Sequence, residues 1–275
     1  MQYNIIVLQN NLQHSNLKKI LFFTIVFTGL ALVVANLFGK DTATTVSLLL
    51  YVPVTLSLVI LSIILSKRFG MKGDHGTAWI LFSIFAILWF IAERISLYYN
   101  LKLGEELFPS EADAFWLAGY PFLFAFMMFY LRPMKNSITK KMIFLAMAIS
   151  VVLLIPPLYI VSYESMDVDL SETAIAIAYP IGDAILLIPA IIGIALFLGG
   201  KVNFLWTLMC IAIVFETIAD TGFLLATIDD SYYEGHPVDI LFIWYYVIFS
   251  FGVYHHITLF KDHRKDPYKN VQELR

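Results

Sequence analysis

The sequence has few charged residues and a single cysteine. Charged residues make up 14% of its 275 positions and hydrophobic residues 60%, a balance foreign to soluble globular domains. Because Cys210 is the only cysteine, an internal disulfide and a cysteine-based metal site are excluded. The first sixteen residues hold no short apolar core followed by small residues, so we expect no removable signal peptide and a first span that anchors the protein.

Several catalytic and cofactor signatures are also missing. The chain has no HExxH or GxSxG motif, and no lysine lies in an apolar segment at a depth suited to a retinal Schiff base. His255 and His256 end the last apolar segment without a facing histidine in another segment, which leaves haem ligation unsupported and places them at the membrane interface. We therefore expect no cofactor.

What the sequence does contain is a series of eight long apolar segments. They lie near residues 17–38, 46–66, 77–99, 111–131, 141–162, 172–198, 203–226 and 237–260. At 1.5 Å per residue, each is long enough to cross a hydrocarbon core of roughly 30 Å. The sequence therefore predicts an all-α integral membrane protein with eight transmembrane helices and short connections, surrounded by membrane lipids.

Basic residues concentrate in alternate connections. They precede the first segment and fill the 2–3, 4–5 and 6–7 connections and the tail, whereas three of the other connections are acidic. The acidic ones contain Glu105 and Glu106, then Glu164, Asp167, Asp169 and Glu172, then Asp229, Asp230 and Glu234. Because Lys and Arg favour the cytoplasmic side, we predict a cell-membrane protein with both termini cytoplasmic. The same residues are the collar expected from this topology and indicate no nucleic-acid binding.

Two copies of one pattern run through the chain. Each half carries a tryptophan fourteen residues before an acid, and an aspartate seven residues before a tyrosine. The pairs are Trp79 with Glu93 and Asp113 with Tyr120, and then Trp206 with Asp220 and Asp239 with Tyr246. The offset between copies stays close to 127, which predicts two parallel four-helix pseudo-repeats, residues 1–136 and 137–275. Recurring interfacial aromatics are the alternative, but they do not explain the paired acids.

The stretch 109–121 reads as a helix start set into the membrane. Ser110 is an N-cap candidate, and Glu111 adds negative charge to the first turn. Asp113, Trp116 and Tyr120 follow at spacings that place them on one helical face. A carboxylate this close to hydrocarbon is costly and needs a partner or a role.

Six acids and one base are predicted to lie within the bundle or at its rim. The acids are Glu93, Asp113, Asp183, Glu216, Asp220 and Asp239, and the base is Arg94. Asp183 is expected near the midplane on the face of Tyr179, and the other acids in the outer half. We expect Arg94 to pair with Asp113 or with an acid of the other half. The unpaired acids then require protonation, water or a bound cation.

Less specific roles are open for these residues. Asp113 and Asp239 can cap helix starts, and the interior acids can be hydrogen-bonding links between helices or the lining of a polar cavity. Pro180 and Pro189 predict a bent sixth helix beside Asp183, either as part of a site or as a tolerated kink.

Four motifs of the chain resemble a known class of membrane region. They are Pro109-Ser-x-Ala-Asp113, Tyr179-Pro-Ile-Gly-Asp183, Ala219-Asp220 and Gly235-x-x-x-Asp239. This set is similar to multi-pass sensor regions found ahead of bacterial diguanylate cyclase and histidine kinase domains, and to stand-alone archaeal membrane proteins of unknown function. The resemblance implies a module that perceives a signal or binds a ligand. Since the chain carries no output domain, it would act through a cytoplasmic or membrane signalling partner.

The sequence thus favours a non-enzymatic module that binds a small polar ligand, a cation or a lipid headgroup in an acidic cavity of the outer half of the bilayer. The predicted ligand-binding residues are Glu93, Arg94, Asp113, Tyr120, Tyr179, Asp183, Glu216, Asp220, Asp239 and Tyr246. A proton- or cation-coupled transporter is one alternative. An intramembrane lipid hydrolase is another, because Gly182-Asp183 is faintly similar to eight-helix lysoplasmalogenases.

Overall fold

The computed structural model describes residues 2–103, 108–164, 170–198, 200 and 202–259, and this part of the chain is helical without a strand. The helices are α1 (Gln2–Leu37), α2 (Lys40–Phe69), α3 (Gly73–Leu103), α4 (Glu111–Leu131), the short 3-10 helix η1 (Arg132–Ser137), α5 (Lys140–Glu164), α6 (Leu170–Phe197), α7 (Asn203–Ile228) and α8 (Asp239–Leu259). Glu105, Glu106, Asp167, Asp169, Lys201 and the basic tail lie outside the described residues.

The prediction of eight transmembrane helices is confirmed, since the eight α-helices are each long and apolar enough to cross a membrane. The chain is therefore a multi-pass membrane protein. Its first helix extends beyond the predicted span and begins at Gln2, because polar residues that lower hydropathy do not interrupt a helix. Pro180 and Pro189 both lie inside the continuous helix α6.

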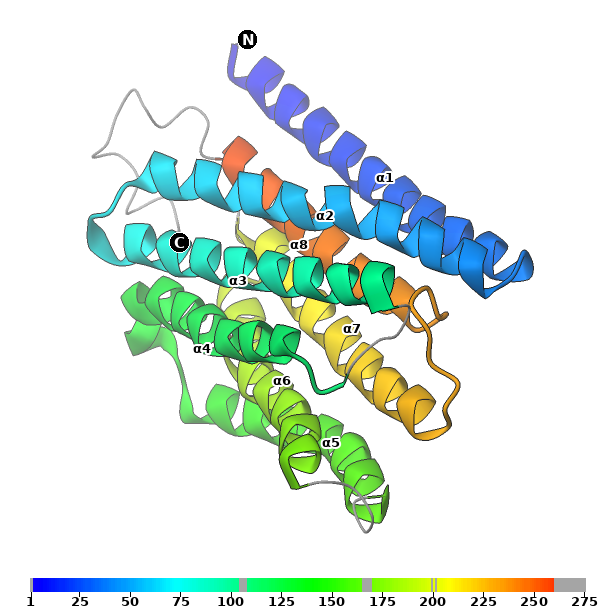
Figure 1. The fold of residues 1–275 in the computed structure, drawn as a ribbon. Helices are drawn as coiled ribbons and strands as arrows, with labels where there is room; N and C mark the ends of the chain where they lie inside the picture. Colours follow the sequence, from blue (N-terminus) through cyan, green and yellow to red (C-terminus); the bar gives the residue numbers. More distant parts are fainter. Residues whose placement is uncertain (1, 104–107, 165–169, 199, 201, 260–275) are drawn as a thin grey trace.

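Six of the helices close into a ring. Following the contacts, α2 packs against α3, α3 against α4, α4 against α6, α6 against α7, α7 against α8, and α8 against α2 (Figure 1). Helix α1 lies outside this ring against α2 and α8, and α5 lies outside it against α6 and α7. Because the connections are short, successive helices run in opposite directions. The starts of α2, α4, α6 and α8 therefore meet at one end of the bundle, which we call the pocket end.

Aromatic side chains fill the interior of the ring towards the other end. Trp79 of α3 and Trp206 of α7 are fully buried, and both contact Tyr130 of α4. His256 is also buried, with its ring 5.0 Å from that of Trp79. The position of His256 at the membrane interface stays a prediction, but its side chain is turned into the core because α8 belongs to the ring.

The outer helices present their apolar side chains outwards. On α1, Phe22, Phe23 and Phe27 are each more than 60% exposed, and on α5 Phe144 and Tyr159 are more exposed still. Apolar surface on this scale is unfavourable in water and is expected of a surface that faces lipid acyl chains.

Glycines allow the ring helices to approach closely. A Cβ atom on Gly119 of α4 would lie 2.2 Å from Trp89 Nε1, and one on Gly193 of α6 would lie 2.0 Å from the Trp206 ring. Small residues at such crossings are the usual means of bringing membrane helices together. The positions of both tryptophans therefore depend on the absence of a side chain on the facing helix.

Gly119→Ala is expected to lower the free energy of unfolding by about 1–3 kcal/mol, because the new methyl group overlaps Trp89 and forces α3 and α4 apart. Thermal and denaturant unfolding in detergent micelles would measure this loss. The neighbouring Ala118 is exposed, so Ala118→Leu is a matched control that should stay within about 0.5 kcal/mol. Equal stability of Gly119→Ala and wild type would contradict the close packing of these helices.

Candidate functional site

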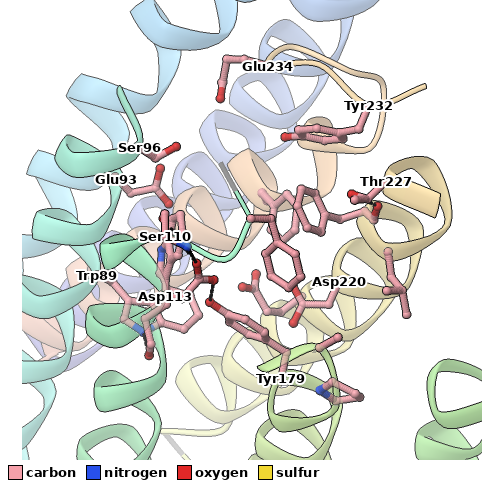
Figure 2. Close-up of a pocket in the computed structure, with 18 of the residues that line it drawn as sticks. Trp89, Glu93, Ser96, Ser110, Asp113, Tyr179, Asp220, Thr227, Tyr232 and Glu234 are labelled. Carbon is pink, nitrogen blue, oxygen red and sulfur yellow. Dashed lines mark hydrogen bonds between the residues drawn. The ribbon is translucent and has the colours of Figure 1, made fainter. Parts of the chain in front are cut away.

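A pocket of about 120 Å³ lies between the helices at the pocket end (Figure 2). Its lining comes from every α-helix except α1, and also from the connections that precede α4 and α8. Five of the lining residues are acids: Glu93, Asp113, Glu216, Asp220 and Glu234. In Figure 2, Glu93 and Ser96 lie on the α3 side of the pocket, and Asp220 and Thr227 on the α7 side.

Asp113 is held at the start of α4 by a capping box. Ser110 accepts a hydrogen bond from Ala112 N through its hydroxyl, and its own backbone N–H donates to Asp113 Oδ2 at 2.6 Å. The predicted N-cap is thereby confirmed. The other carboxylate oxygen, Oδ1, accepts a hydrogen bond from the Tyr179 hydroxyl of α6 at 2.6 Å, as Figure 2 shows. Asp113 therefore links α4 to α6 as well as capping α4.

Asp239 has a similar place at the start of α8. Its Oδ2 accepts a hydrogen bond from Gly235 N at 2.6 Å, and its Oδ1 accepts one from the Tyr232 hydroxyl at 2.9 Å. The Asp239 side chain is buried and does not line the pocket, whereas Tyr232 does. Asp239 thus reaches the pocket only through its tyrosine partner.

Glu93 faces the pocket from the last third of α3. Its Oε1 accepts a hydrogen bond from the Tyr246 hydroxyl of α8 at 2.7 Å. One turn earlier on α3, the Trp89 ring donates from Nε1 to the Trp116 carbonyl of α4 at 2.9 Å. These two contacts join α3 to α8 and to α4, and they place three aromatic rings around one carboxylate.

Asp183 lies deeper than the pocket lining and is fully buried. Its Oδ1 accepts a hydrogen bond from the Tyr120 hydroxyl at 2.9 Å, and its carboxyl group lies within reach of Asp220. A Cβ atom on the preceding residue, Gly182, would fall 2.5 Å from the Tyr120 ring, so only glycine permits this contact. Asp183 and Tyr120 therefore support the floor of the site.

Glu216 and Asp220 stand one helical turn apart on α7 and both line the pocket. Glu216 is 6% exposed, and its Oε2 has no hydrogen-bond partner within the described part of the chain. Asp220 Oδ2 and Asp183 Oδ2 are also buried and accept no hydrogen bond there, and these two carboxyl groups lie within reach of each other. Because an unpartnered buried oxygen is costly, Glu216 Oε2 is the position in the lining at which a ligand or water would be stabilised most, with Asp220 beside it.

Glu234 comes to the pocket from the connection between α7 and α8. Ser47 of α2 donates a hydrogen bond to Glu234 Oε1 at 2.6 Å, and Thr44 donates to the Glu234 carbonyl at 2.7 Å. Asn36 at the end of α1 also donates to the carbonyl of Gly235 at 2.9 Å. The connection is thereby fastened to the turn between α1 and α2. Burial raises the pKa of Glu234, although the Ser47 hydrogen bond and the charge of Arg94 oppose this shift.

The stability contributed by Glu234 is expected to fall as the pH rises. A raised pKa means that the folded protein binds this proton more tightly than the unfolded chain, so stability is greatest below the ordinary glutamate pKa of about 4.3 and is lost on passing the raised value. The melting temperature of wild type should therefore fall relative to that of Glu234→Gln as the pH rises from 5 to 8. The exposed Asp41 supplies a control, Asp41→Asn. A wild-type melting temperature that rises relative to that of Glu234→Gln over this range would contradict a raised pKa of Glu234.

Arg94 does not take the predicted role. It forms no ion pair with any described acid, and its Nε is buried without a hydrogen-bond partner there. Its guanidinium group instead lies over the Phe90 ring at 5.2 Å. Arg94 follows Glu93 directly, and adjacent residues of a helix point in different directions, so Arg94 does not line the pocket, although its charge acts on the lining residue Glu234.

The structure brings most of the predicted site residues together. Glu93, Asp113, Tyr179, Glu216, Asp220 and Tyr246 all line the pocket, whereas Arg94, Tyr120, Asp183 and Asp239 do not. Sequence reasoning missed Glu234 as a site residue, although the acidic connection containing it was noticed. Within the described residues, no group of three or more His, Cys, Asp and Glu side chains is arranged to hold a metal ion.

Comparison of the chain with protein-family models, curated proteins and solved structures finds no match. The geometry of the pocket is therefore the basis for inferring a function.

Proposed function

We propose that the protein is a non-enzymatic membrane module that binds a ligand in the pocket described above. The observation that carries this proposal is the buried, unpartnered Oε2 of Glu216 in the pocket lining, one helical turn from Asp220, which also lines the pocket. A polar or cationic group placed there would satisfy this oxygen and offset the cost of burying it. The aromatic lining would exclude water from around such a group.

The two-fold organisation of the bundle gives binding a structural consequence. The order of contacts around the ring supports a pseudo-repeat. Helix α3 packs between α2 and α4, just as α7 packs between α6 and α8. The contact of α4 with α6 likewise has its equivalent in the contact of α8 with α2. Helices α1 and α5 follow this correspondence only in part. The pocket takes lining residues from both halves. A ligand that prefers one packing of the halves would shift the population of states, which a signalling partner could detect.

The proposed orientation places both termini in the cytoplasm and the pocket end outside. Basic residues at the end opposite the pocket support it, among them Lys67, Arg68, Lys72 and Arg132. In a Cys210→Ala background, which has no cysteine, Asp229→Cys should react with an impermeant maleimide in intact cells, and Lys72→Cys only after permeabilisation. Both positions are exposed. The reverse labelling pattern would overturn the orientation.

Thermal unfolding in maltoside micelles tests the ligand-binding proposal. Wild type is screened against sodium, calcium, zinc and simple amines, alongside the double variant Glu93→Gln/Asp220→Asn. A compound that binds the folded pocket should stabilise wild type by about 2.7 kcal/mol when its free concentration is one hundred times its Kd. It should stabilise the variant much less. If no compound raises the melting temperature of wild type selectively, the proposal fails.

Proton-coupled transport is a second candidate, favoured by one specific observation. The carboxyl group of Asp183 lies within reach of Asp220, so acidic groups continue from the pocket towards the middle of α6. Such a series is typical of proton pathways in transporters. Substrate flux into proteoliposomes that depends on a pH gradient and is lost in Asp183→Asn would favour transport over binding alone.

The same pair of carboxyl groups is also compatible with lipid hydrolysis, since two adjacent carboxyl groups can serve as acid and base. Hydrolysis of a lipid panel by purified wild type, with loss of activity in Asp183→Asn, would establish an enzyme. No turnover by wild type would leave the binding module as the function.

A further inference from the structure

The chemistry of the pocket lining restricts the class of ligand. Among the described lining residues there are five acids and no Lys, Arg or His. These acids would therefore repel an anionic ligand and attract a cationic one from several sides, and the nearby Arg94, whose charge acts on Glu234, does not itself line the pocket. This lining selects for positive charge.

The same lining is poorly suited to a metal ion. The described residues hold no group of three or more potential metal-ligating side chains. Asp113 already accepts hydrogen bonds from Ser110 and Tyr179, and Glu93 accepts one from Tyr246, so part of their coordinating capacity is used. A calcium ion needs six or more oxygen ligands, and a magnesium ion usually keeps several of its water molecules. The positive charge is better supplied by a group that needs no coordination shell.

Aromatic rings form the remainder of the recognition surface. The lining includes Trp89, Trp116, Tyr179, Phe223, Tyr232 and Tyr246. Aromatic faces attract organic cations, and such rings around an ammonium group are a recurrent means of recognising it. They also bury the methyl or methylene groups attached to the nitrogen, which a metal ion lacks.

The size of the pocket and the position of Glu216 suit a small organic cation. The volume of about 120 Å³ is close to the roughly 150 Å³ of a cavity that accommodates benzene. Glu216 is 6% exposed and keeps Oε2 unpartnered, with Asp220 one turn further along α7. A single ammonium group near these two side chains would compensate their negative charge, which no Lys, Arg or His of the described lining does.

We propose that the pocket binds an organic ammonium group, with Glu216 and Asp220 as its anionic partners and the surrounding rings as its apolar shell. This inference rests on the proposed function, since it names the ligand class of the same site. Two sources share this chemistry. A free amine can come from the aqueous phase, and the ammonium group of a lipid headgroup can come from the bilayer that surrounds the helices.

Matched ligands test the ammonium group without altering the protein. In maltoside detergent, which has no ammonium group, the affinity of wild type for choline is compared with that for 3,3-dimethylbutan-1-ol, its uncharged isostere. We expect choline to bind about tenfold more tightly or better, since the two differ only in the charge. Equal affinity for the two compounds would overturn the proposal.

Two variants locate the site. Glu216→Gln should weaken choline binding by about tenfold or more, whereas Asp74→Asn, which removes one acid paired with Arg132 at the opposite end, should leave it unchanged. If both variants bind choline as wild type does, the ammonium group is not held by Glu216 and the proposal fails.

The lipid arm distinguishes the two sources. Nanodiscs of phosphatidylcholine are compared with nanodiscs of phosphatidylglycerol, which lacks the ammonium group. A higher melting temperature in phosphatidylcholine, lost in Glu216→Gln, identifies a headgroup; stabilisation by free choline alone identifies a free amine. If neither source stabilises the protein while another compound of the screen does, the ammonium inference fails and the binding function stands. If no compound stabilises it, both fail.

Discussion

Trp206→Ala is expected to lower the free energy of unfolding in detergent micelles by about 3–5 kcal/mol. Trp206 is fully buried on α7, where its ring stacks on Phe197 with centroids 5.8 Å apart and contacts Tyr130 at 5.4 Å. Gly193 of α6 leaves the space that the indole fills. Alanine would open a cavity between α4, α6 and α7 that the rigid helices cannot close.

Two further substitutions make this result interpretable. Trp79 of α3 is also fully buried, so Trp79→Ala should cost a similar amount. Phe144 on α5 is 75% exposed to the lipid side, and Phe144→Ala should change stability by no more than about 0.5 kcal/mol. Losses from Trp206→Ala no larger than those from Phe144→Ala would contradict the described core.

Asp113→Ala is expected to cost about 2–4 kcal/mol, because it removes the acceptor of two hydrogen bonds in a nearly water-free place. The side chain is 3% exposed and accepts from Ser110 N and from the Tyr179 hydroxyl, both at 2.6 Å. Both donors belong to half-buried residues, and a donor left without its acceptor costs about 1–3 kcal/mol where water does not replace it. The loss should appear in thermal unfolding and as fraying at the start of α4 in hydrogen exchange.

A double-mutant cycle separates the two functions of Asp113. Tyr179→Phe removes only the link from α4 to α6, and Asp113→Asn keeps one carbonyl acceptor, so each should cost less than Asp113→Ala. Asp113→Ala and Tyr179→Phe should be non-additive by about 0.5 kcal/mol or more, as expected for residues in direct contact. Strict additivity would show that the hydrogen bond contributes nothing to stability.

Much of the fold follows from the sequence alone, since hydropathy and length identify a membrane helix from local information. The eight helices and the N-cap at Ser110 are of this kind. The ring order is not, because it depends on which faces come into contact. His256 illustrates the difference: its position at the end of an apolar segment indicated an interface, but α8 is shared between two neighbouring helices and turns it inwards.

The site could be predicted only in part for the same reason. Spacing and topology placed Glu93 and Asp220 in the last third of their segments and Glu216 one turn before Asp220, and the structure brings all three to one pocket. Glu234 could not be found in this way, because its position follows from hydrogen bonds of an irregular connection to Ser47 and Thr44 on α2. The role predicted for Arg94 depended on charge alone and ignored its direction on α3.

The tyrosines were predicted as site residues, but their specific partners were not. Tyr246 donates to Glu93, Tyr179 to Asp113 and Tyr120 to Asp183, each from a different helix. A tyrosine brings a donor to a carboxylate while its ring stays in apolar surroundings. These pairs hold most of the acids in place. They leave Glu216 as the lining acid with an unpartnered oxygen among the described residues, beside Asp220, which lies within reach of Asp183.

A structure determined with and without choline in maltoside tests the central claim most directly. The account predicts new density in the pocket, next to Glu216 and Asp220 and against the rings of Trp116 and Tyr179. Choline bound elsewhere, or a pocket that is unchanged at a concentration at which choline raises the melting temperature, would contradict it.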